Sequence, residues 1–189
     1  MQVAEAIASR RAQRTLDNRP IPDEIARELV EAMRLSASCN NSQPWRVVVA
    51  RQSDTLTQVK STLSKGNAWA TTSPLILVVA ARSDDDCRLP DSRDYYLFST
   101  GLSVGQMLLR ATELGIIAHP IAGFNQAEVK KFLEIPNEYV VITYVICGYP
   151  GTDQSLLSEK QKEREVTRPE RKPVGENFFS GKWAVPLAL

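Results

Sequence analysis

The chain has 189 residues, of which 43% are hydrophobic and 24% charged, and its formal net charge is +1. This length suits one domain with a core of its own. The near-neutral charge gives no general affinity for nucleic acid or for anionic membranes, so any anion site has to be local. No apolar run is long enough to span a membrane, and residues 1–14 lack the apolar stretch of a signal peptide. We therefore expect neither nucleic acid nor membrane as a partner.

The cysteines Cys39, Cys87 and Cys147 lie far apart and form no CxxC pair. This spacing argues against a disulfide framework or a zinc cluster and fits a reducing, cytoplasmic location. The acidic run Asp84–Asp86 is a weak sign of a metal site, and a solvated loop is the favoured interpretation. No metal is predicted.

The N-terminal half begins with two helices. Val3, Ile7 and Arg10 share one helical face, which predicts a short first helix that ends in the segment Arg10–Arg14. The prolines and acids of Pro20–Glu24 are typical of the start of a second helix. Its expected inner face consists of Ile25, Leu29, Ala32, Met33 and Ser36.

A polar turn follows the second helix. Pro44 cannot continue a helix, so the segment Asn41–Trp45 is expected to turn the chain into a strand over Arg46–Ala50. The side-chain amides of Asn41 and Gln43 either bond their own backbone or read a flat ligand. A surface helix over Asp54–Leu63 and a buried strand over Leu75–Ala81 come next.

The C-terminal half contains the longest expected helix, roughly Asp94–Leu114, whose second half is apolar nearly all round. Gly101 and Gly105 allow close approach of a backbone, either from another subunit or from a helix of the same chain. Further elements are a loop over Gly115–Gly123, a helix over Gln126–Leu133 that Asn125 caps, and a strand over Tyr139–Cys147. The charged segment after Pro150 is expected to be an extended arm whose Phe178, Phe179 and Trp183 end docked.

Two basic clusters lie at opposite ends of the chain: Arg10, Arg11 and Arg14, and Arg168, Arg171 and Lys172. If the fold brings them together, they form a phosphate clamp, because guanidinium groups bind phosphate through paired hydrogen bonds. Two unrelated solvated faces are the alternative. Between the clusters lie the amide-rich turn and the small-residue loop Pro120–Gly123, whose backbone N–H groups can approach a flat ring. Phosphate at one end and such a ring at the other describe a mononucleotide such as FMN.

Several segments, in this order and spacing, carry a wider resemblance: Ser9–Arg14, the Pro-initiated second helix, Ser38–Trp45, Gly101–Gly115, Ala118–Phe124, Gly148–Pro150 and Arg171–Pro173. Together they cover nearly the whole chain, which resembles the flavin-dependent nitroreductase family. The resemblance implies an α+β fold with a central, mostly antiparallel sheet flanked by helices. It also implies an intertwined homodimer, with residues 1–150 as the FMN-binding domain and residues 151–189 as an arm of the same domain that wraps the dimer.

The resemblance also implies the FMN-binding residues. Arg10 would hold the phosphate with Arg11 and Ala12 close by, and Arg171 would close on it. Arg14 would reach the ring near N1 and O2 and stabilise its negative charge. The other implied contacts are Ser38, Cys39 and Asn41 from the partner subunit, Asn67 at the pyrimidine edge, and Pro120, Ile121, Ala122 and Gly123 along the ring. Two positions depart from the family. Ala12 stands where Ser is more usual, and Cys39 stands where Ser or Thr is more usual.

The implied activity is that of an FMN-dependent NAD(P)H oxidoreductase. It would pass hydride by a ping-pong mechanism to a small acceptor such as a nitroaromatic, a quinone or a flavin. The chemistry would belong to the flavin, so no catalytic side chain is predicted, and the single histidine, His119, is expected to be structural. The alternatives are a protein that binds FMN without turnover, a flavoenzyme of another reaction type on the same fold, and an interaction protein without a nucleotide.

Overall fold

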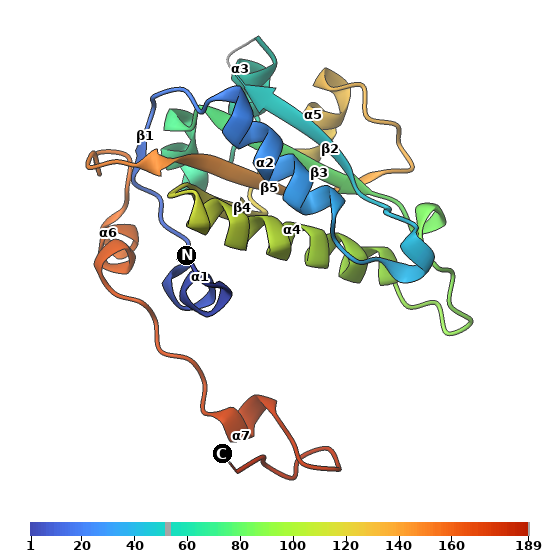
Figure 1. The fold of residues 1–189 in the computed structure, drawn as a ribbon. Helices are drawn as coiled ribbons and strands as arrows, with labels where there is room; N and C mark the ends of the chain where they lie inside the picture. The colour runs from blue at the N-terminus through green and yellow to red at the C-terminus, as the bar shows by residue number, and fades with distance from the viewer. Residues whose placement is uncertain (52–53, 189) are drawn as a thin grey trace.

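A sheet of five antiparallel strands separates two layers of helices in the computed structural model, which describes residues 1–51 and 54–188 (Figure 1). The strand order is β1-β5-β3-β2, and β4 also pairs with β5. The expected α+β fold with a central antiparallel sheet is therefore confirmed. The strands are β1 Leu16–Asp17, β2 Arg46–Arg51, β3 Leu75–Ala81, β4 Ile117–Ile121 and β5 Val140–Pro150.

Strand β3 lies at the centre of both hydrophobic cores. All seven of its residues are buried, as its continuous apolar run predicted. Because side chains alternate across a strand, Ile76 and Val78 face one core, whereas Leu75, Leu77 and Val79 face the other. The sheet is thus covered on both sides.

Helices α2 (Asp23–Arg34) and α4 (Tyr95–Glu113) cover one face of the sheet. Leu29 and Met33 of α2 are buried, as expected. The hydroxyl of Ser103 in α4 donates a hydrogen bond to the Met33 carbonyl at 3.1 Å, which fixes the contact between the two helices. The other expected inner residues divide: Ser36 is buried, Ile25 and Ala32 are half-buried, and Ala26 was missed.

The opposite face is covered by α3 (Asp54–Ser61), α5 (Gln126–Phe132) and the 3-10 segment η2 (Lys65–Thr72). The side chain of Asn125 accepts a hydrogen bond from the Glu128 N–H at 3.2 Å, so the predicted cap of α5 is confirmed. Helix α3 is not simply a surface helix, because Leu56 and Val59 are buried in the core.

Two predicted elements differ from the structure. The first helix, α1, covers only Val3–Ser9, and the chain leaves it at Arg10 in an extended conformation. The expected loop over Gly115–Gly123 contains strand β4 instead. Among the residues that the structure describes, β4 pairs with β5 alone, and a strand with one free edge tolerates Pro120, which lacks a backbone N–H.

The expectation that the cysteines form no disulfide framework was also wrong. A disulfide joins Cys39, in the 3-10 segment η1 (Cys39–Asn41), to Cys87, which follows the 3-10 segment η3 (Ser83–Asp85). The pairing spans 48 residues of sequence, so the spacing alone gave no sign of it. Cys147 is a buried free cysteine.

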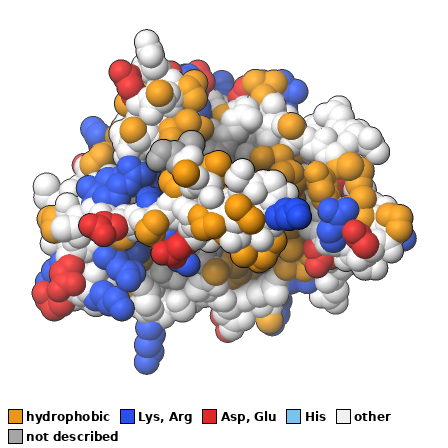
Figure 2. Space-filling view, turned by 90° about the horizontal axis from the view of Figure 1, so that it is seen from below, with side chains coloured by type: hydrophobic (Ala, Val, Ile, Leu, Met, Phe, Trp, Pro, Cys, Tyr) orange, Lys and Arg blue, Asp and Glu red, His pale blue; other side chains and the backbone are white. Residues whose placement is uncertain are grey.

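The segment after β5 is an extended arm. Helix α6 (Glu159–Val166) lies beside the N-terminal segment, whereas α7 (Val174–Asn177) and the C-terminal end project away from the sheet and helices (Figure 1). The expectation that this arm ends docked is not met within one chain, since Phe178 is 59% and Trp183 is 87% exposed. Figure 2 looks onto this side and shows hydrophobic side chains across its middle.

Helix α4 also leaves apolar surface exposed. Leu97, Phe98 and Leu102 lie on its outer face with 41%, 56% and 41% of their surface exposed. A Cβ atom added at Gly101 or Gly105 would meet nothing within 4 Å outside the helix's own nearby backbone, so no other described helix of the same chain packs closely against either glycine. Across residues 1–51 and 54–188, no helix is both long and apolar enough to cross a membrane.

Candidate functional site

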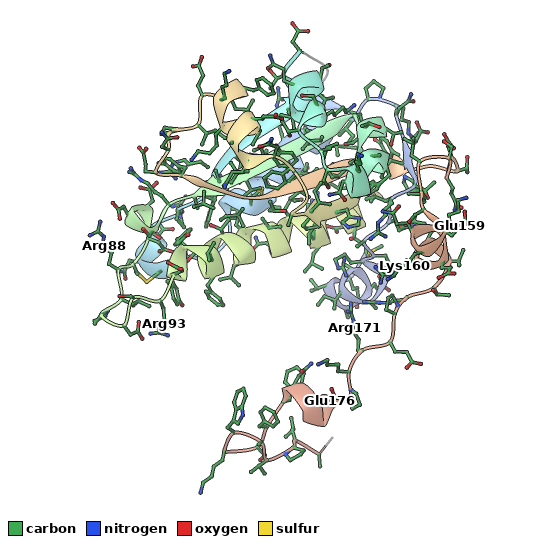
Figure 3. The ribbon with its side chains drawn as sticks, turned by 180° about the vertical axis from the view of Figure 1, so that it is seen from behind. Arg88, Arg93, Glu159, Lys160, Arg171 and Glu176 are labelled. Carbon is green, nitrogen blue, oxygen red and sulfur yellow. A yellow bond between two sulfur atoms is a disulfide. The ribbon has the colours of Figure 1, made fainter. Side chains whose placement is uncertain are left out.

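The fold brings the two basic clusters together. A cavity of about 280 Å³ lies between the extended segment after α1 and the chain that leaves α6. Figure 3 shows Arg171 beside α1, although the two are separated by most of the chain. The residues that line the cavity are Arg10, Arg11, Ala12, Arg14, Arg164, Thr167, Arg168, Pro169 and Arg171.

The charge in this cavity is almost all positive. Six arginines line it, and none of its lining residues is acidic. Burial lowers the pKa of Arg10, and the nearby charges of Arg168 and Arg171 lower it further. Guanidinium groups gathered in this way repel one another unless an anion lies between them. The cavity therefore fits phosphate, which guanidinium groups bind with paired, charge-assisted hydrogen bonds.

Backbone contacts attach the arm to the N-terminal segment. Arg11 donates to the carbonyl of Glu165 at 2.9 Å, and Arg168 donates to the carbonyl of Ala8. These bonds orient the two arginines from opposite sides of the cavity. Lys172, which the sequence grouped with them, does not line the cavity and lies 3.8 Å from Glu176 instead.

Glu165 is the residue that positions the segment after α1, and the sequence analysis missed it. Its carboxylate is buried and accepts hydrogen bonds from the N–H groups of Arg14 and Thr15 and from the Thr15 hydroxyl, at 3.0–3.2 Å. It also lies 3.7 Å from the Arg14 guanidinium. The arm is thus part of the cavity's structure and not only its cover.

Arg14 connects the cavity to two neighbouring rings, which are tilted by 34° with respect to each other. Its guanidinium lies 5.9 Å from the centre of the Trp69 ring, and that ring lies 4.9 Å from the His119 ring. His119 Nδ1 lies 2.9 Å from the Gln13 carbonyl. Because a carbonyl can only accept, Nδ1 donates, so His119 fixes the backbone beside Arg14.

The pKa of His119 lies below its ordinary value because burial disfavours the charged ring, and Arg14 lowers the pKa further. The unfolded chain therefore takes up a proton near pH 6.5 more readily than the folded chain does. We expect the wild type to lose up to about 1 kcal/mol of unfolding free energy through this group between pH 7.5 and pH 5.5. Urea unfolding of wild type and His119→Asn at both pH values tests this, and equal losses in the two proteins would contradict it.

The segment Pro120–Gly123 is held beside Asn67. The Asn67 amide donates to the Gly123 carbonyl at 2.9 Å. A Cβ atom at Gly123 would lie 2.5 Å from both Asn67 Nδ2 and Ser64 Oγ, so a side chain at this position would have to displace them. The structure thus brings Asn67, Pro120, Ile121, Ala122 and Gly123 into one region.

The turn that contains Ser38, Cys39 and Asn41 lies elsewhere. It is near the Tyr95 end of α4, whereas α1 and α6 lie toward the other end (Figure 1). Gln43 donates from its side chain to Asn41 Oδ1 at 3.0 Å and from its backbone to Ser38 Oγ at 3.0 Å. Within one chain these amides hold their own turn, and the sulfur of Cys39 is bonded to Cys87.

Comparison with known proteins identifies the family of this chain. The family model described as "Nitroreductase family" matches residues 7–149. NADH dehydrogenase of Thermus thermophilus is 25% identical, with 78% of this chain and 86% of the relative covered. The FMN reductase [NAD(P)H] of Bacillus subtilis is 22% identical, with coverage of 89% and 74%.

A solved structure described as an oxidoreductase containing FMN superposes with a TM-score of 0.85 at 26% identity, covering 98% of this chain and 94% of that one. The family model spans well over half of the chain, and the fold agrees with it over nearly the full length. The chain belongs to the nitroreductase family.

Proposed function

We propose that this protein binds FMN and acts as an NAD(P)H oxidoreductase. The observation that carries the proposal is the cavity that six arginines line without an acidic residue, with Asn67 and Pro120–Gly123 held together as a separate region. Relatives named for FMN reduction and for NADH dehydrogenation support the redox class.

Each part of the site has a role in this proposal. Arg10 and Arg171 bind the phosphate, with Arg11 and Ala12 beside it. Asn67, Pro120, Ile121, Ala122 and Gly123 lie along the ring, and Arg14 reaches toward its N1 edge. Bound FMN would accept hydride from NADH or NADPH and pass it to a small acceptor such as a nitroaromatic, a quinone or a flavin. No side chain is needed as an acid or base, and His119 instead donates a hydrogen bond from Nδ1 to the backbone carbonyl of Gln13.

We also propose that the active form is a homodimer. Ser38, Cys39 and Asn41 of the partner subunit would complete the site, and residues 151–189 would wrap the partner. The exposed Leu97, Phe98 and Leu102 of α4 and the exposed aromatic residues of the arm support this, because apolar surface of this kind is typical of interfaces.

Replacing Phe98 with Glu should shift the protein toward monomers, because it places a charge in the middle of the proposed interface. Sedimentation at micromolar concentration measures this, with Phe132→Glu as a control at an exposed phenylalanine of α5, on the opposite face of the sheet. A wild type that sediments as an FMN-loaded monomer would contradict the dimer.

Arg14→Ala should lower the midpoint potential of bound FMN while leaving most of its affinity, because the phosphate contacts remain. A charge about 4–5 Å away is worth a few kcal/mol at an effective dielectric near 20. Glu165, 3.7 Å from Arg14, reduces this effect. Since 30 mV corresponds to about 1.4 kcal/mol for two electrons, we expect a fall of tens of millivolts. Spectroelectrochemistry that finds an unchanged potential with FMN bound would place Arg14 away from the ring.

The proposed activity is tested by stopped-flow absorbance. The purified protein should be yellow, its released chromophore should have the mass of FMN, and NADH or NADPH should bleach it rapidly. Bound FMN that stays oxidised with both nicotinamides would indicate a protein that binds FMN without turnover. A colourless protein that does not respond to added FMN would contradict the proposal altogether.

A further inference from the structure

Three potential metal ligands converge at the end of the molecule opposite the arginine cavity. The sulfur atoms of Cys39 and Cys87 and a carboxylate oxygen of Asp86 all lie within 4.8 Å of one another. They come from two segments far apart in the sequence, η1 and the chain after η3. Figure 3 shows Arg88, which follows Cys87, at this far end from Arg171.

Asp86 gives an independent indication of a cation. The residue is only 8% exposed. One carboxylate oxygen accepts from the Ser42 hydroxyl at 2.6 Å and from the Cys87 N–H at 2.8 Å, but the other is buried without a hydrogen-bond partner. A buried carboxylate with an unpaired oxygen is costly unless a positive charge compensates it.

The neighbouring acids do not share this condition. Asp84 forms an ion pair with Arg88 at 2.6 Å. Asp85 pairs with Arg82 at 2.6 Å and with Arg46 at 3.0 Å. In the part of the chain that the structure describes, Asp86 forms no such pair, although arginines are close enough to serve both of its neighbours. Asp84 and Asp85 thus have arginine partners, whereas the buried carboxylate of Asp86 has none among the described residues.

We propose that Cys39, Asp86 and Cys87 form a Zn²⁺ site when the disulfide is reduced. Two thiolates and one carboxylate are ligands that Zn²⁺ accepts, and water would complete a tetrahedral set. Two molecules of a small thiol supply the two electrons and two protons that convert the disulfide to two thiols, and they leave as their own disulfide. Each protein thiol then loses its proton on binding the metal.

The Zn²⁺ site and the disulfide exclude each other, because the disulfide uses both sulfur atoms. Either form holds the turn at Cys39 to the chain at Cys87, so the local fold is fixed in both. Cys39 is also one of the residues proposed to reach the FMN of the partner subunit, but Zn²⁺ binding to the cluster does not require FMN and is tested on protein freed of it, whether or not the proposed activity is correct.

The test uses the full chain, reduced and then freed of reductant without oxygen, and titrated with Zn²⁺ against a coloured chelator. We expect one Zn²⁺ per chain in the reduced protein and none in the oxidised protein. Co²⁺ in place of Zn²⁺ should give the charge-transfer absorption of thiolate ligands. The Cys147→Ser variant should bind Zn²⁺ as the wild type does, because Cys147 is buried in the core and away from the cluster.

Two variants identify the ligands. Removing an outer partner of a metal site lowers metal affinity roughly 10–100-fold. Cys87→Ser removes a ligand itself, so its Zn²⁺ affinity should fall by more than that. Asp86→Asn, which keeps the side-chain shape, should lose at least about 10-fold, whereas Asp84→Asn, its exposed neighbour, should lose nothing. Circular dichroism checks that each variant is folded. A reduced wild type that binds no stoichiometric Zn²⁺, or an Asp86→Asn variant that binds as tightly as Asp84→Asn, would overturn the proposal.

Discussion

Replacing Arg10 with Ala should weaken FMN binding by roughly 10- to 100-fold. Arg10 lines the cavity together with Arg168 and Arg171, whose charges lower its pKa. A charge-assisted hydrogen bond from a half-buried group is worth about 1.5–3 kcal/mol, which corresponds to one or two decades of affinity. Quenching of flavin fluorescence on titration of the apoprotein measures the effect.

Arg93→Ala is the matched control. Arg93 lies in an exposed loop, pairs with Asp91 at 2.7 Å, and is at the opposite end of the molecule from Arg171 (Figure 3). The Arg93→Ala substitution removes one positive charge from the chain, as Arg10→Ala does, but does not touch the cavity. Equal losses of FMN affinity in the two variants would mean that only the net charge matters and that the cavity is not the phosphate site.

The second large effect is expected at Glu165. Replacing it with Ala leaves the N–H groups of Arg14 and Thr15 and the Thr15 hydroxyl without their acceptor, next to an uncompensated guanidinium. Breaking a buried pair in this way costs about 3–5 kcal/mol of unfolding free energy. Urea unfolding measures this loss, and FMN affinity should fall with it because the segment Arg10–Arg14 is no longer held.

Glu163→Ala removes an exposed carboxylate from the same helix and should leave the unfolding free energy within about 0.5 kcal/mol of wild type. Glu165→Gln keeps an acceptor for the hydroxyl and the N–H groups and should be less destabilising than Glu165→Ala. If Glu165→Ala unfolds at the same urea concentration as Glu163→Ala, the arm does not position the N-terminal segment.

Elements with strong local signals were predictable from the sequence. The apolar run of β3 could only be a buried strand, and its boundaries are those observed. Asn125 marked the start of α5 because a side-chain oxygen at that position satisfies a free N–H of the first turn. The prediction of one phosphate site depended on the assumption that the fold joins the two arginine clusters, and arginines of both clusters do line one cavity.

Features that depend on distant contacts were not predictable in this way. Glu165 lies among other charged residues of the arm, and only its contact with Thr15, 150 residues away in sequence, distinguishes it from them. The disulfide between Cys39 and Cys87 has no local pattern either. Strand β4 was missed because a proline such as Pro120 favours a loop unless the strand is known to lie at an edge of the sheet, and the sequence does not show which strands are edges.

The most direct test of the phosphate site compares FMN with riboflavin, which has the same ring but no phosphate. If the arginine cavity binds the phosphate, the apoprotein should bind FMN at least about 100-fold more tightly than riboflavin, since several charge-assisted hydrogen bonds are lost together. Arg10→Ala should narrow that ratio while leaving riboflavin affinity unchanged. Equal affinities of the wild type for FMN and riboflavin, measured by fluorescence titration, would contradict the account.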